Sequence, residues 1–246
     1  YTQGKYARTN QSINLNYRTK AVNLFGSYNY WLNKNSQELD IVRRFRDKES
    51  KQLLSIFDQE SNFTNRNTSN NAKLGIDVNV SKKTTIGALV SGFVNKEQFK
   101  NANTTLLQNN AAITESSTLA TTQVDGKWKN FSGNLNLRHV FDSTGRELSF
   151  DADYMNYSQK NNQGLFNHYF DNAHIPNGPG DTLLSNIPSD IKIYSLKADY
   201  SQSLKGNAKL EAGIKASFVK TDNNAQYDSL INGQKVTDFG RTNHFI

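Results

Sequence analysis

The chain has 246 residues, of which 35% are hydrophobic and 11% aromatic, and a formal net charge of +7 at pH 7. No run of about 18 apolar residues occurs, which excludes a transmembrane helix but not a transmembrane β-barrel, whose strands are hydrophilic on average. The aromatic content argues against simple disorder. The chain has no cysteine, and thus no disulfide framework. Its basic residues are scattered, and the one dense run, 43–48, is broken by Asp47, so we expect no nucleic-acid partner.

The first expected hairpin comprises residues 12–18 and 21–32. Apolar and polar side chains alternate along both segments, with Ile13 and Leu24 on the apolar face. A tilted membrane-spanning strand needs about 9 to 11 residues, so the second segment is long enough to cross a bilayer.

Residues 33–70 are expected to form a long polar connection, rich in charges and then in asparagine. A short helix is expected within it at residues 49–58, because Leu53, Leu54 and Phe57 share helical spacing.

The second hairpin, residues 71–93, shows a period of two most clearly. Even positions are apolar on both sides of a turn at 81–84, whereas Leu89 and Phe93 break the pattern. Such a hairpin has one apolar and one polar face. The polar residues 95–126 have no sustained period and are interpreted as a loop or a strand extension.

The third hairpin pairs residues 127–141 with 148–154 across a turn at 142–145. The third connection, residues 158–190, contains all three prolines. Proline is thus absent from every expected strand, as ladder hydrogen bonding requires.

The fourth hairpin pairs residues 194–200 with 208–218. A last polar connection, residues 221–242, precedes residues 244–246, which are interpreted as the start of a ninth strand.

The four tight turns are centred near Thr19, Lys82, Thr144 and Lys205, so they are 63, 62 and 61 residues apart. Because successive strands run in opposite directions, all tight turns are expected at one end and all long connections at the other. This asymmetry is typical of an outer-membrane barrel, with short periplasmic turns and long external loops.

The two faces of the expected strands differ in charge. Mid-strand charges share the polar face: Lys73, Asp77, Arg138, Asp151, Asp153, Lys197, Asp199, Lys209, Glu211 and Lys215. That face must meet water or a polar lumen. Aromatic residues gather near both strand ends and resemble the girdles of membrane barrels: Tyr28, Tyr30, Trp31, Tyr154, Tyr157 and Tyr194 at one end, and Tyr17, Phe141 and Tyr200 at the other.

An extended soluble sheet with a covered apolar face would explain the alternation equally well. It would explain neither the one-sided connections nor small outward residues such as Ala88 and Ala216, which would leave a packed core underfilled. The sequence therefore favours an all-β, antiparallel, up-and-down transmembrane barrel, present in part as about eight strands in four hairpins.

The segments YRTKAVNLFGSYNYWLNK, NAKLGIDVNVSKKTTIGALVSGF, GNLNLRHVFDSTGRELSFDADY and YSLKADYSQSLKGNAKLEAGIKASF resemble the barrel region of TonB-dependent receptors, and more narrowly the outer membrane beta-barrel family. Members are much longer, with about 22 strands around a plug domain. The resemblance implies that residues 1–246 are part of a single barrel domain in the bacterial outer membrane, without plug or signal peptide. The implied partners are outer-membrane lipid, an unknown solute, the plug, and a TonB-type energising protein.

Catalytic chemistry is not indicated, since no GxSxG, P-loop, GxGxxG or HExxH motif occurs. We expect no enzyme activity, no cofactor and no metal. His168 and His174 in the third connection are the best candidate metal ligands, but solvated loop histidines are commoner.

The residues chosen as candidate ligand contacts are polar or aromatic and lie in the expected external loops: Trp31, Arg43, Arg44, Tyr169 and Phe170. Two other functions remain open at this stage. One is a complete eight-stranded barrel with a structural or adhesion role, whose small interior is filled by its own side chains. The other is a soluble β-rich surface module.

Overall fold

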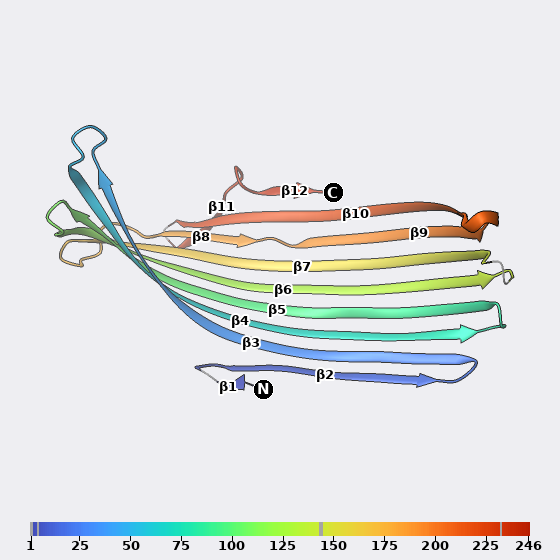
Figure 1. The fold of residues 1–246 in the computed structure, drawn as a ribbon. Helices are drawn as coiled ribbons and strands as arrows, with labels where there is room; N and C mark the ends of the chain where they lie inside the picture. The colour runs from blue at the N-terminus through green and yellow to red at the C-terminus, as the bar shows by residue number, and fades with distance from the viewer. Residues whose placement is uncertain (1, 4, 143–144, 232) are drawn as a thin grey trace.

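The computed structural model describes residues 2–3, 5–142, 145–231 and 233–246, which form one antiparallel twelve-stranded sheet (Figure 1). The strands are β1 (Thr2–Gln3), β2 (Ala7–Arg18), β3 (Val22–Arg46), β4 (Leu53–Asn79), β5 (Thr84–Asn109), β6 (Thr114–Val140), β7 (Glu147–Asp171), β8 (Asp181–Asn186), β9 (Ser189–Ser203), β10 (Lys209–Ile231), β11 (Gln234–Thr237) and β12 (Asn243–Phe245). A single 3-10 turn, η1 (Lys205–Asn207), links β9 and β10. Chain neighbours from β2 to β7 are also sheet neighbours, so the expected all-β antiparallel class and the hairpin order are confirmed.

The tight turns all lie at one end of the sheet, at the right of Figure 1. They join β2 to β3, β4 to β5, β6 to β7 and β9 to β10, as the spacing predicts. Ser143 and Thr144 of the third turn lie outside the described residues. The final strand β12 pairs with β10, which confirms the expected strand near the chain end.

Three of the four long connections were expected as loops, and that expectation is wrong; for the second, residues 95–126, the alternative of a strand extension is confirmed. β4, β5 and β6 contain 27, 26 and 27 residues, so the segments 33–70 and 95–126 are mostly strand and end in short turns. The segments 158–190 and 221–242 are also largely strand. Polar residues predominate on both faces of these extensions, so no sustained hydrophobic alternation marks them. The ladder of backbone hydrogen bonds nevertheless continues from the hairpins of the band.

The helix expected at residues 49–58 is also absent, because β4 begins at Leu53. Asp47 holds the turn before it by accepting hydrogen bonds from the amides of Glu49 and Ser50, at 3.0 and 2.8 Å. Beneath this turn, the rings of Phe45 and Phe57 meet edge to face with centroids 5.0 Å apart. Cross-strand pairing thus overrides the helical spacing of the leucines. Among the described residues, no helix is long and apolar enough to span a membrane.

The strand register aligns the apolar positions of separate hairpins into rows. One row runs across β3, β4, β5, β6, β7, β9 and β10 through Leu24, Ile76, Ala88, Leu135, Ala152, Leu196 and Ala216. We call the face with Ile76 and Leu135 the outer face, its apolar rows the band, and the opposite face, with Asp77 and Asp153, the inner face.

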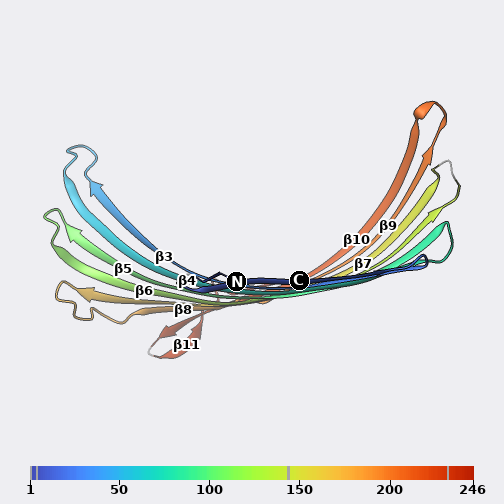
Figure 2. The same ribbon diagram turned by 60° about the horizontal axis from the view of Figure 1, so that its bottom comes forward.

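No second layer covers the band. Figure 2 shows one curved layer, and among the described residues Ile56 is the only buried hydrophobic side chain. In the band, Leu135 is 62% and Ile214 74% exposed. Monomeric soluble proteins rarely expose contiguous apolar patches of this extent, so the band requires lipid or another apolar partner.

Eight strands cross the band: β2, β3, β4, β5, β6, β7, β9 and β10. Within the described residues, β2 pairs with β3, and residues 209–219 of β10 pair with β9, while no pairing joins β2 to β10. Both edges of the band are therefore open in the part of the chain that the structure describes. An unpaired strand edge is not tolerated in lipid, so each edge must find a further partner in the membrane.

Candidate functional site

The inner face is polar and cross-linked along the band. Asn134 donates a hydrogen bond to Asp153 at 2.7 Å, and the Lys197 ammonium lies 2.5 Å from the Asp199 carboxylate. Arg138 on β6 meets Glu147 on β7 through two 2.7 Å hydrogen bonds. Charges of both signs are balanced by neighbours, so this face is a hydrated wall with no dominant sign.

At the end of the band remote from the tight turns, the inner face becomes aromatic. Phe93 on β5 and Trp128 on β6 meet edge to face, with ring centroids 5.4 Å apart. With Tyr157, Ile191 and Ile193 they line a recess of about 530 Å³. Phe93 breaks the sequence alternation because it belongs to this recess and not to the lipid-facing band.

A second recess of about 330 Å³ adjoins the first, and Trp128 lines both. Its other aromatic wall is Trp31, and amide side chains including Asn95 and Asn161 surround it. The Asn161 side-chain oxygen is buried without a hydrogen-bond partner in the described structure. We call Trp31, Phe93, Trp128 and Tyr157 the inner shelf: flat aromatic surfaces beside amides and the Glu97 side chain, on which a polar solute can stack and form hydrogen bonds.

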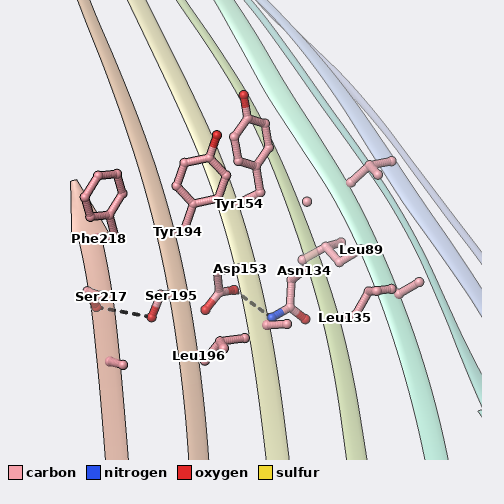
Figure 3. Close-up of a pocket in the computed structure, with 15 residues that line it drawn as sticks. Leu89, Asn134, Leu135, Asp153, Tyr154, Tyr194, Ser195, Leu196, Ser217 and Phe218 are labelled. Carbon is pink, nitrogen blue, oxygen red and sulfur yellow. Dashed lines mark hydrogen bonds between the residues drawn. The ribbon is translucent and has the colours of Figure 1, made fainter. Parts of the chain in front are cut away.

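The outer face has a groove of about 680 Å³ on the band. Figure 3 shows Tyr154, Tyr194 and Phe218 side by side on neighbouring strands, with centroid separations of 5.1 and 6.4 Å. Small residues such as Gly133 and Ala216 form part of its floor. The small outward residues predicted to underfill a core thus leave a shallow groove that lipid chains can fill.

The aromatic girdle is confirmed for Tyr154 and Tyr194, whereas two members of it were placed wrongly. Trp31 and Tyr157 point to the inner face and line the recesses there. Trp31 is one position from the outward Tyr30, and Tyr157 is three positions from the outward Tyr154. Residues an odd number of positions apart along a strand lie on opposite faces of the sheet.

The five candidate ligand contacts do not meet at one place. Arg43 and Arg44 lie near the tip of β3, opposite Phe57 and Ile56 of β4. Tyr169 and Phe170 lie at the end of β7, and three strands separate β3 from β7. Of the five, only Trp31 lies on the inner shelf; the role of all five remains a prediction.

Tyr169 already has a partner, because its hydroxyl donates a 2.6 Å hydrogen bond to Asp181. This bond raises the pKa of Tyr169. Sequence reasoning missed Phe93 and Trp128 as site residues, although the break in alternation at Phe93 was the available signal. His168 lies on β7 and His174 in the following turn, and the expectation that these histidines bind no metal remains a prediction.

Residues 139–246 match a family model described as the outer membrane protein beta-barrel family. Searches of curated proteins and of solved structures gave no match. The matched segment includes β7, β9 and β10, which carry most of the outer groove. Residues 139–246 are thus similar to the outer membrane protein beta-barrel family, and this similarity supports a location in the outer membrane.

Proposed function

We propose that this chain is a barrel segment of an outer-membrane receptor that takes up a solute, of the TonB-dependent type. The observation that carries the proposal is the inner shelf. In a closed eight-stranded barrel the interior is just wide enough for its own side chains, whereas Trp128 is 47% exposed here. An exposed aromatic shelf on the polar wall favours a wider lumen with space for a solute.

Two further features support a receptor. The strands extend far beyond the band, since β4 has 27 residues and a spanning strand needs about 9 to 11. These extensions raise the hairpin tips well above the membrane, where they meet solutes first. The open edges of the sheet are compatible with additional strands of a larger barrel. In this proposal the plug and the TonB-type energising protein act through the parent chain.

The test compares solute consumption by cells with the full-length protein, without it, and without the TonB-type protein. The medium contains a defined mixture of neutral oligosaccharides, peptides and metal chelates. We expect one solute class to persist in the medium in both deletion strains. Uptake that is independent of the energising protein would contradict the TonB-dependent mechanism, and no difference for any solute would contradict uptake itself.

A matched pair of variants then tests the shelf. Trp128→Ala on the inner face is expected to weaken binding of the identified solute about tenfold, as for loss of one well-packed aromatic contact. Phe131→Ala, on the outer face of the same strand, serves as the control and should leave binding unchanged. Equal loss in both variants would show that the effect comes from the fold rather than from the shelf.

The alternative is a complete eight-stranded barrel with a structural or adhesion role, favoured by the count of eight strands crossing the band. The isolated 246 residues would then fold in detergent into a monomer with heat-modifiable gel mobility. Failure to fold alone, with folding restored in the full-length protein, would favour the segment of a larger barrel.

A further inference from the structure

The outer face changes character abruptly where the band ends on the side away from the tight turns. On seven of the eight strands that cross the band, all except β2, the first charged residue of the outer face beyond the band is basic. These residues are Lys34, Arg66, Lys96, Lys129, Lys160, Lys192 and Lys220, which we call the basic belt. The inner face at the same height carries amides and the aromatic shelf.

The belt is densest on β5, β6 and β7. Lys127 is paired directly with Lys96 on one side and with Lys160 on the other. Lys129 lies two residues from Lys127 on the same face. Arg66, Lys96, Lys127 and Lys160 line a hollow of about 470 Å³, and Asp125 is the one acid of the outer face among its lining residues.

This concentration of positive charge is not compensated within the described residues. None of the seven ion pairs there includes Arg66, Lys96, Lys127, Lys129 or Lys160. Asp125 instead accepts a 3.2 Å hydrogen bond from Gln98. The charge of Lys129, followed by burial and the charges of Lys96 and Lys160, lowers the pKa of Lys127, which lies outside the band. Like charges placed directly opposite on neighbouring strands destabilise a sheet. An anionic partner would therefore stabilise the protein by offsetting the repulsion between these lysines.

The distance of the basic belt from the edge of the band indicates what this anionic partner is. Lys129 and Lys127 are two and four residues beyond Phe131, the last apolar residue of the band on β6. Two and four residues span about 7 and 13 Å along a strand, or about 5 and 10 Å above the band for a strand tilted by about 40°. Lipid head groups occupy the region just outside the hydrocarbon core, and flexible lysine side chains reach readily into it.

We propose that the basic belt binds the phosphorylated head groups of outer-leaflet lipids, and that Arg66, Lys96, Lys127, Lys129 and Lys160 form its principal site. The acyl chains of the same lipids lie on the band below, over Phe131 and the groove of Tyr154 and Tyr194. The hollow lies on the same face as the band and just beyond its edge, and this position favours a membrane lipid over a soluble anion. The site is independent of the solute taken up and of energy coupling.

The test measures lipid binding to the full-length protein in detergent by native mass spectrometry. The probes are a diphosphorylated lipid A, the same lipid without phosphates, and inorganic phosphate. We expect retention of the diphosphorylated lipid and little retention of the other two. Equal binding of the dephosphorylated lipid, or equally tight binding of inorganic phosphate, would overturn the proposal.

The variant K96Q/K127Q/K160Q is expected to weaken binding of the diphosphorylated lipid about 100-fold, since each lysine near an anionic surface contributes about a factor of 5. The matched control K48Q/K82Q/K205Q removes the same charge from turns and should bind as the parent does. Heat-modifiable mobility confirms that each variant is folded. Undiminished lipid binding by a folded K96Q/K127Q/K160Q protein would overturn the proposal.

Discussion

The band and the strand extensions beyond it are held together by the same ladders of backbone hydrogen bonds, but their amino-acid patterns differ. In the band, one face meets lipid, and apolar residues therefore recur at every second position, as in Leu74, Ile76 and Val78. In the extensions both faces meet water, so β4 continues through Asn67, Asn65 and other polar residues with no change in pairing. Hydrophobic alternation therefore indicates which solvent the two faces of a strand meet, and its absence does not mean that a strand is absent.

The largest expected effect comes from a charge placed on the outer face in each of these two regions. Leu135→Arg lies mid-band on β6 and should cost about 2–4 kcal/mol in the free energy of unfolding from vesicles, because arginine is expensive at the bilayer midplane. Gln123→Arg, on the same face of the same strand in the extension, should cost less than about 1 kcal/mol. Urea titration of both proteins in vesicles measures the difference, and equal costs would contradict the placement of the band.

A smaller effect is expected from two glycines on the outer face of the band. A Cβ at Gly92 would lie 2.7 Å from the backbone oxygen of Asn130, so Gly92→Ala should destabilise the protein by about 1 kcal/mol or more. A Cβ at Gly133 meets nothing within 4 Å, so Gly133→Ala should stabilise it by about 0.5 kcal/mol through lower backbone entropy. The same vesicle titration applies, and a stabilising Gly92→Ala would refute the register of β5 against β6.

The smallest effect is expected at the turn between β3 and β4, at the tip of the strand extensions. Hydrogen bonds from Ser50, the largest contribution, and from Glu49 lower the pKa of Asp47 below its ordinary value. Because the pKa is lowered, the ionised Asp47 side chain stabilises the turn at pH values above the ordinary aspartate pKa. This stabilisation is lost as the pH falls below about 4 and the carboxylate is protonated. The protection factor of the Ser50 amide against hydrogen exchange should therefore fall as the pH drops below about 4, and Asp47→Ala should remove that pH dependence. Unchanged pH dependence in the variant would exclude Asp47 as the cause.

The sequence predicts the band well because lipid imposes a pattern on it. The turns near Thr19, Lys82 and Lys205 and the strands beside them follow from alternation and from turn residues. Three of the four extensions were interpreted as loops, and residues 95–126 as a loop or a strand extension, because two mainly polar faces leave no periodic signal. The helix prediction for residues 49–58 was wrong for a related reason. Local spacing carries no information about the neighbouring strands, whose pairing with β4 determines its conformation.

The residues of the candidate site could be predicted from the sequence less well than the fold. Phe93 and Trp128 are 35 positions apart in the chain and meet only through the pairing of β5 with β6. Lys96, Lys127 and Lys160 are similarly scattered, so their alignment in one row depends on the register. Pairwise register is a long-range property, and composition alone cannot supply it.

The central claim is that the outer face of the band meets lipid while the inner face meets water. Spin labels placed singly at each position from Ala72 to Val80, in the full-length protein reconstituted in vesicles, test it by their accessibility to oxygen and to a water-soluble nickel complex. We expect alternation with a period of two, with oxygen access highest at Leu74, Ile76 and Val78 and nickel access highest at Lys73 and Asp77. Uniform accessibility along this segment, or maxima of oxygen access at the odd positions, would contradict it.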